Sequence, residues 1–248
     1  MMKLYTADLS AYSARVRMQI YAKDIKDIVF ELPEHWGLPK IRERFPIGRV
    51  PVLAINGDGD TIPESEVIAE YLEEIYPEPS LLGSTPRENA HIRTLARFGD
   101  VYIMNAMFLL SRRTGALGRQ TPTAIRDDPF NDQLTNEFLR NLKALDRLIG
   151  TDGFACMGRI TLADCALVPG FFWVEAVMPR AGVDSPLPAY ANVAAYWAAI
   201  QKNKHAAKVL IELYRGLEER REMIRSGEIE RFRAEAAAAW KAADAQSQ

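Results

Sequence analysis

The sequence predicts two domains, a small α/β domain followed by an all-helical one. Over residues 1–80, strand and helix patterns alternate in the order strand, helix, strand, irregular segment, two strands and helix. A Pro/Gly/Ser-rich segment comes next, and beyond it the periodic stretches have helical rather than strand spacing. We therefore expect an α/β domain at 1–80, a linker at 81–87 and a helical domain at 88–248.

The first strand and the first helix follow from short apolar patterns. Residues 2–5 predict a strand, and a helix is expected to begin near Ser10 or Ala11. One face of that helix carries Ala14, Met18, Tyr21, Ala22 and Ile25. Residues 28–32 predict a second strand, which would lie parallel to the first if the helix between them is a crossover.

Residues 48–76 contain the clearest turn and helix-boundary signals of the chain. A strand at 50–55, the turn sequence NGDGD and a short return strand at 61–62 indicate a hairpin. A helix with Ser65 as its expected N-cap follows and ends before Pro77. Its N-terminal N–H groups favour a carboxylate, and the Glu64 side chain favours an ammonium group. This stretch therefore predicts a site for the two ends of an amino acid.

The remainder of the chain is predicted to be helical. The pattern indicates one long helix over about 88–113, a helix ending at Gly150, and further helices between 193 and 217. Thr161 and Asp164 have the spacing of a capping box, which we interpret as structural. The apolar residues 165–177 then predict a buried helix that is interrupted or kinked near Pro169. The charge-rich tail beyond residue 216 favours helix, with a break at Ser226 and Gly227.

Composition excludes several classes of function. The formal net charge is −2, so the chain lacks the basic character of a nucleic-acid-binding protein. The first residues lack a signal-peptide core, and no apolar run reaches the length of a membrane helix, which predicts a cytoplasmic protein with no membrane partner. Two cysteines fit a reducing compartment, and three unclustered histidines argue against a metal site.

Three segments, in order, resemble the soluble glutathione transferase family, and the resemblance covers residues 2 to about 215. They are LSAYSARVRMQIYAKDI, GRVPVLAINGDGDTIPESEVIAEYLEEIYP and TLADCALVP. The first resembles the loop and helix of the serine-type members, which include the tau-, theta- and zeta-like classes. The resemblance implies a bacterial-type enzyme with a thioredoxin-like first domain, a cis peptide bond before Pro51, and a homodimer with its interface near Arg93 and Arg97.

The resemblance also implies which residues bind glutathione, the expected cosubstrate. The Val50–Pro51 backbone would pair with the cysteinyl part, and Glu64 and Ser65 would hold the γ-glutamyl end. Three cationic or polar side chains are candidates for binding the glycyl carboxylate: His35, Lys40 and Arg49.

A hydroxyl group is expected to activate the thiol. Glutathione's thiol has an ordinary pKa of about 8.5, so little thiolate exists at neutral pH without a stabilising donor. Ser10 fits this role by its place in the loop, Ser13 is the rival and Tyr5 the third choice. The loop contains no cysteine, which argues against thiol-exchange chemistry. Alternatively, Ser10 and Ser13 could have a purely structural role as caps of the first helix.

The acceptor substrate is expected to be a small, largely apolar electrophile, with an aromatic one favoured. Candidates for its pocket are Leu9, Tyr12, Tyr102, Met107 and Arg112. Within the family, β-aryl-ether cleavage and dehalogenation are the favoured reactions, while maleylacetoacetate isomerisation is less favoured because the SSCS-like loop of that class is absent. The alternative function is a non-catalytic binding module with the same fold.

Overall fold

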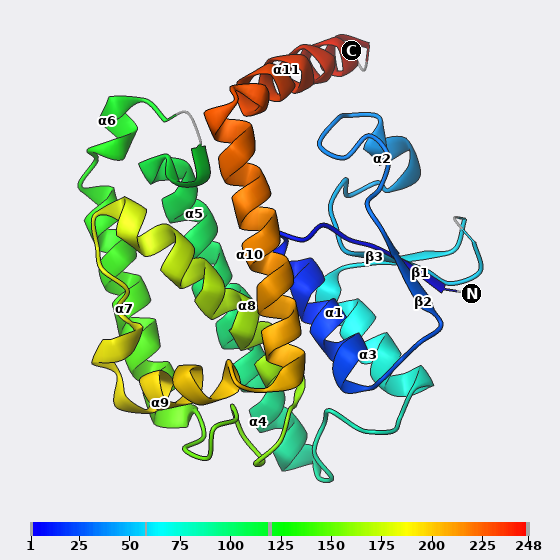
Figure 1. Cartoon of the computed structure of the whole chain (residues 1–248), viewed down its shortest axis with the longest axis vertical. Coiled ribbons are helices and arrows are strands. Elements are labelled where there is room, and N and C mark those ends of the chain that lie inside the picture. Colours follow the sequence, from blue (N-terminus) through cyan, green and yellow to red (C-terminus); the bar gives the residue numbers. More distant parts are fainter. Residues whose placement is uncertain (1, 58, 119–120, 247–248) are drawn as a thin grey trace.

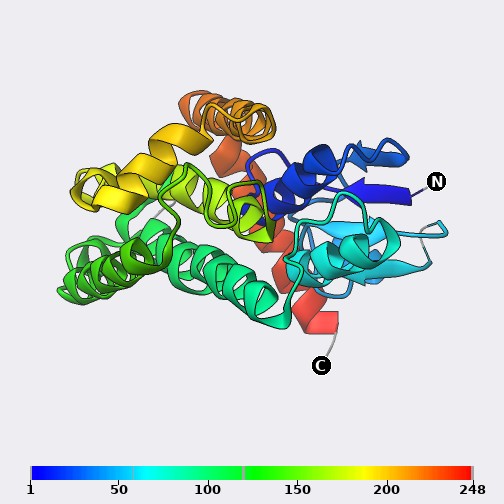
Figure 2. The same ribbon diagram turned by 90° about the horizontal axis from the view of Figure 1, so that it is seen from below.

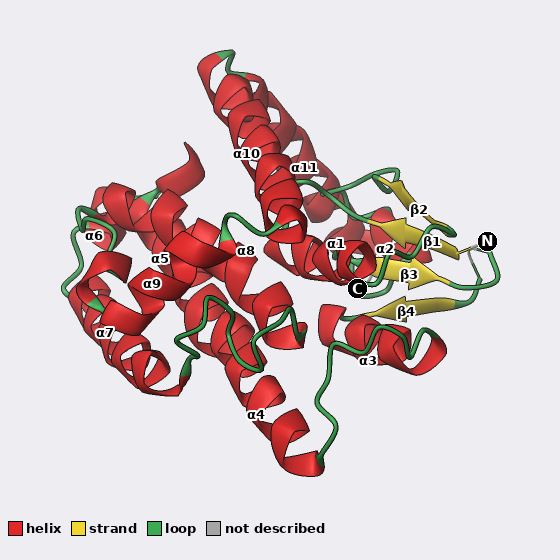
Figure 3. Cartoon of the chain, turned by 60° about the horizontal axis from the view of Figure 1, so that its bottom comes forward, coloured by secondary structure: helices red, strands yellow, loops and turns green. Residues whose placement is uncertain are grey.

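A computed structural model describes residues 2–57, 59–118 and 121–246 of the chain. A four-stranded sheet lies on one side of the molecule and a group of helices on the other (Figures 1 and 3). The chain of the sheet half runs through β1 (Met2–Tyr5), α1 (Ala11–Ala22), β2 (Ile28–Glu31), α2 (Ile41–Arg44), β3 (Val52–Ala54), β4 (Thr61–Pro63) and α3 (Ser65–Ile75). This order confirms the predicted α/β arrangement.

The sheet has the strand order β2-β1-β3-β4. The β1 and β2 strands are parallel, with Met2 opposite Ile28, whereas β3 pairs antiparallel with both β1 and β4. Parallel pairing was expected from the crossover helix. Apolar side chains on one face of the sheet pack against α1 and α3, and those on the other face pack against α2. Both faces of the sheet are therefore covered.

The helical half contains longer elements, as the sequence predicts. They are α4 (Pro86–Arg97), the π-helical segment η1 (Phe98–Met104), α5 (Asn105–Thr114), α6 (Thr123–Arg126), α7 (Phe130–Leu148), α8 (Leu162–Val177), α9 (Ala191–Ile200), α10 (Lys204–Arg225) and α11 (Glu228–Gln246). Short 3-10 turns occur at Ala116–Gly118, Met178–Ala181 and Leu187–Ala189. Figure 2 shows α4 and α8 side by side, with α10 lying beside α1 of the sheet half.

The expected regular helix over 88–113 is interrupted by the π-helical segment. The chain remains helical throughout, but Phe98–Met104 has the wider π geometry. Gly99 lies in this segment, and a Cβ atom there would be 2.7 Å from the carbonyl oxygen of Ala166 on α8. The absence of a side chain thus allows η1 and α8 to touch. Segments of π-helix often occur at functional sites.

Helix α8 is the core helix of the second half. Fourteen of its residues are buried, and it continues through Pro169, so the predicted interruption is wrong. Packing of its buried side chains offsets the stability that is lost because proline cannot donate a hydrogen bond. The helix begins with the predicted capping box: Asp164 Oδ2 accepts from the Thr161 N–H at 2.8 Å. The segment Leu162–Ala181 is long and apolar enough to cross a bilayer, yet 83% of its apolar window is buried inside the protein.

The C-terminal tail folds into two helices that break at the predicted place. Helix α10 ends at Arg225, and α11 begins at Glu228. Figure 1 shows α11 turning away from α10 and passing toward α2. A Cβ atom on Gly37 would lie 2.8 Å from the ring of Phe232, and the Arg42 guanidinium stacks on Trp240 at 4.8 Å. The tail therefore covers the α2 region of the same chain.

Candidate active site

A cavity of about 230 Å³ opens where α1, the β3–β4 hairpin, the start of α3 and η1 meet. Its lining combines residues from both halves of the chain: Tyr12, Ile47, Arg49, Val50, Pro51, Pro63, Glu64, Ser65, Glu66, Arg97, Asp100, Val101 and Asn105. Five of the residues predicted to bind glutathione are in this set: Arg49, Val50, Pro51, Glu64 and Ser65.

The N-terminus of α3 forms one wall of the cavity. Helix α3 begins at Ser65, and Glu64 occupies the N-cap position with φ 71° and no side-chain capping bond. The expectation that Ser65 is the N-cap is therefore wrong by one position. The Ser65 N–H belongs to the first helical turn, where backbone donors have no partner within the helix. The adjoining Val50–Pro51 peptide bond is cis.

Three charged side chains of the cavity lining, Glu66, Arg97 and Asp100, form a cluster with the buried Arg15. The Arg15 guanidinium, only 2% exposed, pairs with Asp100 at 2.8 Å and also with Glu66. Arg97 pairs with the same two carboxylates, at 2.8 Å from Glu66. Asp100 also lines the cavity, and its Oδ1 is buried without a hydrogen-bond partner among the described residues.

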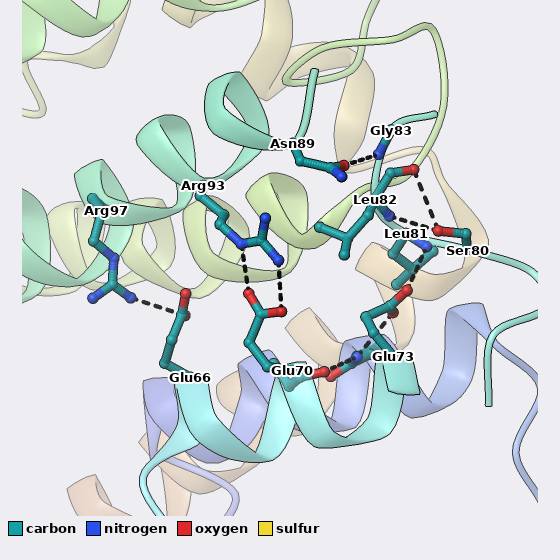
Figure 4. Close-up of polar contacts among 12 residues, drawn as sticks. Glu66, Glu70, Glu73, Ser80, Leu81, Leu82, Gly83, Asn89, Arg93 and Arg97 are labelled. Atoms are coloured by element: carbon teal, nitrogen blue, oxygen red, sulfur yellow. Dashed lines mark hydrogen bonds and ion pairs between the residues drawn. The ribbon is translucent and has the colours of Figure 1, made fainter. Parts of the chain in front are cut away.

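Helix α3 is tied to α4 along one face. Glu66, Glu70 and Glu73 follow one another along α3, and Figure 4 shows Glu66 facing Arg97 and Glu70 facing Arg93. Arg93 binds both oxygens of Glu70 at 2.8 Å, which lowers the pKa of Glu70. The arginines expected at a subunit interface therefore pair within the chain.

Ser10 and Ser13 occupy different environments at the start of α1. Ser10 is the N-cap of α1, and its Oγ accepts from the Ser13 N–H at 3.2 Å. Ser10 is partly exposed but does not line the cavity described above. Ser13 is fully buried, and its Oγ has no hydrogen-bond partner among the described residues. The third hydroxyl, Tyr5, is also fully buried and accepts a hydrogen bond from Arg44.

Tyr12, in the first turn of α1, lines the cavity. Burial, and next the negative charge of Asp100, raise the pKa of its hydroxyl, which is therefore protonated and able to donate at neutral pH. The Tyr12 ring stacks on Phe108 with centroids 5.9 Å apart, and Phe108 contacts Trp173 at 5.5 Å. An aromatic row thus extends from the cavity into the helical half.

His35 and Lys40 lie outside this cavity. Both are exposed, and they line a separate, open depression of about 700 Å³ together with Glu43 and Arg44. Arg49, by contrast, lines the cavity, is exposed, and makes no ion pair with the carboxylates of the described residues. Arg49 is thus the one predicted glycyl-binding residue that the structure brings next to Val50 and Ser65.

The residues predicted for the acceptor pocket are dispersed, apart from Tyr12. Met107 is fully buried in the core of the helical half, while Tyr102 is 41% exposed and packs against Phe98. Arg112 is exposed near the far end of α5. Leu9 is partly buried and lies against α10 at Gly216. The structure therefore does not gather these side chains around one opening.

Sequence reasoning missed the place in the site of five residues from α1, α3, α4, η1 and α5: Arg15, Glu66, Arg97, Asp100 and Asn105. The one available signal was a lone acidic residue, Asp100, within the otherwise apolar run Phe98–Met104. Within the described residues, no group of histidine, cysteine or acidic side chains could hold a metal ion. Both cysteines are free and buried, and burial raises the pKa of Cys156 to about 11.

Two family models match the chain. The model for the N-terminal domain of glutathione S-transferases covers residues 4–80, and that for the C-terminal domain covers residues 128–199. Among curated proteins, the maleylacetoacetate isomerase of Pseudomonas aeruginosa is 34% identical over 184 residues, which span 70% of this chain and 82% of that protein. The chain belongs to the glutathione S-transferase family.

Solved structures of the family have the same fold. A glutathione S-transferase from Methylobacillus flagellatus with glutathione bound aligns over 84% of this chain and 98% of its own, with a TM-score of 0.67 and 24% identity. A maleylacetoacetate isomerase from Anaeromyxobacter dehalogenans with bound dicarboxyethyl glutathione and citrate aligns over 84% and 90%, with a TM-score of 0.62 and 25% identity. The thioredoxin-like first half and the all-helical second half agree with these structures.

Proposed function

We propose that the chain is a glutathione transferase that binds glutathione in the cavity between α1, α3 and η1. The observation that carries this proposal is the composition of the cavity. Its lining combines the α3 N-terminus, the exposed Arg49 and the carboxylate-bearing Asp100 with Val50 and Pro51. Glutathione presents matching groups, namely two carboxylates, one ammonium group and an extended peptide backbone.

Each group of glutathione has a counterpart in this cavity. The γ-glutamyl carboxylate binds at the Ser65 N–H and hydroxyl, where the positive end of the helix dipole favours an anion. The ammonium group lies between Glu64 and Asp100. The cysteinyl backbone pairs with Val50 in the manner of an added strand. Arg49 binds the glycyl carboxylate, and His35 and Lys40 would need a ligand that extends beyond the cavity.

Thiol activation is assigned to a hydroxyl at the N-terminus of α1. Ser10 is the first choice, because it is partly exposed at the N-terminus of α1, where the helix dipole also favours a thiolate. Tyr12 is a second candidate because its protonated hydroxyl belongs to a residue that lines the cavity. A hydrogen bond to a charged group contributes about 1.5–3 kcal/mol, which lowers a thiol pKa by roughly one to two units.

The acceptor is proposed to be a small aromatic electrophile. The row formed by Tyr12, Phe108 and Trp173 supports this choice, because aromatic side chains bind apolar rings by stacking. The thiolate would form a bond to an electrophilic carbon while the leaving group departs with its electron pair, as a phenolate from an aryl ether or as a halide. Isomerisation stays a third possibility, since a curated relative carries the name maleylacetoacetate isomerase.

The oligomeric state and location follow the family expectation. We propose a cytoplasmic homodimer, with the exposed apolar side chains of Val67, Val101 and Tyr102 near the shared surface. Light scattering at micromolar concentration would detect twice the chain mass of 27.9 kDa. A single-chain mass at that concentration would contradict the dimer.

The proposed activity is tested by measuring the thiol pKa of bound glutathione from its thiolate absorbance, together with turnover of aryl halides, aryl ethers and maleylacetoacetate. Wild-type protein should lower the thiol pKa by about one unit or more. Ser10→Ala should abolish most of this shift, and Tyr12→Phe serves as the comparison. If the protein binds glutathione but neither lowers its thiol pKa nor turns over any of these substrates, the non-catalytic module would be favoured instead.

A further inference from the structure

The loop that carries Ser10 is held by a buried arginine. Arg17 on α1 is 1% exposed, and it donates to Thr6 Oγ1 at 2.5 Å. It also donates to the carbonyl oxygens of Ala7 and Asp8, each at 3.1 Å. One guanidinium thus binds three consecutive residues of the loop between β1 and α1.

Helix α10 of the helical half supplies the counter-charge. Glu212 Oε2 accepts from Arg17 Nε at 2.7 Å, and its other oxygen accepts from the Tyr21 hydroxyl at 2.6 Å. One helical turn further, Arg215 Nε donates to Asp8 Oδ2 at 2.7 Å. The same loop is therefore bound from α1 and from α10, which are separated by some 195 residues in the sequence.

Gly216 brings α10 into direct contact with the loop. A Cβ atom at this position would lie 2.6 Å from the Leu9 backbone nitrogen and 3.0 Å from the Asp8 Cβ. Any larger residue would therefore displace either the loop or the helix. Leu9, which α10 approaches at Gly216, directly precedes Ser10 in the sequence.

A backbone hydrogen bond links the position of Ser10 to that of Ala7. The Ser10 N–H donates to the Ala7 carbonyl oxygen at 3.1 Å, and that oxygen is also an acceptor for Arg17. Ser10 Oγ in turn accepts from the Ser13 N–H. A displacement of Ala7 or Asp8 is thus transmitted to the Ser10 hydroxyl. Misplacing a reacting group by about 1 Å can cost about a hundredfold in rate.

We propose that Arg17, Glu212 and Gly216 are positioning residues that fix the thiol-activating loop from the helical half. This inference rests on the proposed function, because it assumes that the loop 6–10 presents the activating hydroxyl of Ser10. The hydrogen bonds that carry it lead to Ser10. The helical half then contributes to activation of the thiol as well as to selection of the acceptor.

The test uses Glu212→Gln and Gly216→Ala, with Ile211→Ala as the matched control on an exposed site of the same helix. Two quantities are measured: amide hydrogen exchange at Ser10 and Ser13, and the thiol pKa of bound glutathione. Both variants should speed exchange about tenfold, as expected for a local weakening of roughly 1.4 kcal/mol. Both should also raise the thiol pKa by about half a unit or more, while Ile211→Ala changes neither quantity.

The outcomes separate this inference from the proposed function. If Ser10→Ala and Tyr12→Phe raise the thiol pKa but Glu212→Gln and Gly216→Ala do not, the positioning role is overturned and thiol activation stands. If no loop variant changes the thiol pKa, both are overturned. Should Gly216→Ala fail to fold, Glu212→Gln alone decides, since it is isosteric and retains one acceptor oxygen. Faster exchange in Ile211→Ala as well would also count against a specific contact.

Discussion

The Arg15 guanidinium on α1 and the Asp100 carboxylate on η1 are 2.8 Å apart, although 85 residues separate them in the sequence. Burial lowers the pKa of Arg15, and the neighbouring carboxylates of Asp100 and Glu66 compensate for its charge. The pair joins the two halves of the chain directly beneath the proposed glutathione site. Its integrity is therefore expected to affect both stability and binding.

Arg15→Met should destabilise the protein by about 3–5 kcal/mol, because it leaves two carboxylates near the cavity floor without their buried partner. Urea unfolding measures the change. Arg225→Met is the control, since Arg225 pairs with Glu218 and Glu222 on the exposed face of α10 and should contribute about 1 kcal/mol or less. Equal losses in the two variants would contradict the structural role of Arg15.

Stability should depend on pH through Asp164. Burial raises its pKa from the ordinary value of 3.8 to about 6. The folded form then binds this proton more tightly than the unfolded form, so the contribution of Asp164 falls as pH rises from about 4 to about 6 and is constant above. The shift of about two units corresponds to roughly 3 kcal/mol.

Asp164→Asn isolates this effect, because the variant lacks the titrating group while all other carboxylates remain. The stability difference between wild type and variant should be larger at about pH 4 than at about pH 7, by roughly 3 kcal/mol. Thermal or urea unfolding at the two pH values provides the comparison. A difference that stays constant, or increases toward neutral pH, would show that the folded-state pKa is not raised.

Gly99→Ala tests the close contact of η1 with α8. The added Cβ would lie 2.7 Å from the Ala166 carbonyl oxygen, and we expect a loss of about 1–3 kcal/mol from overpacking. Gly59→Ala is the matched control, because a Cβ there would meet nothing within 4 Å. Glutathione affinity should fall in Gly99→Ala only, since Asp100 is the next residue. Comparable stability of the two variants would argue against the contact.

The two cysteines should be unreactive in the folded protein. Cys156 and Cys165 are 5% and 0% exposed, and burial raises the pKa of both thiols. A chromogenic disulfide reagent should therefore modify neither thiol in native protein but both after unfolding. Rapid modification of the native form would refute the burial and would reopen thiol-exchange chemistry.

Local patterns were sufficient to predict most of the fold. Apolar spacing indicated α1 and α3, the NGDGD turn indicated the β3–β4 hairpin, and Thr161 with Asp164 indicated the start of α8. These features depend on residues that are close in the sequence. The break between α10 and α11 at Ser226 and Gly227 was likewise predicted from neighbouring residues.

Features that depend on tertiary contacts were not predictable in this way. The π-helical segment Phe98–Met104 has an apolar spacing that also suits an α-helix, and its contact with α8 lies outside local sequence. Arg15 pairs with Asp100, and Glu212 pairs with Arg17. Both ion pairs join segments that lie far apart in the sequence. Glu64 rather than Ser65 occupies the N-cap, with a φ of 71° that is uncommon for a residue with a side chain and that local sequence did not signal.

The central claim, that the cavity beside Ser65 binds glutathione, is tested most directly by calorimetric titration of glutathione into Arg49→Met and Lys40→Met. Both residues are exposed cations and receive the same substitution, but only Arg49 lines the cavity. We predict that Arg49→Met weakens binding about tenfold or more, through loss of a charged hydrogen bond, while Lys40→Met binds as wild type. Binding that is lost in Lys40→Met and unchanged in Arg49→Met would contradict the proposed site.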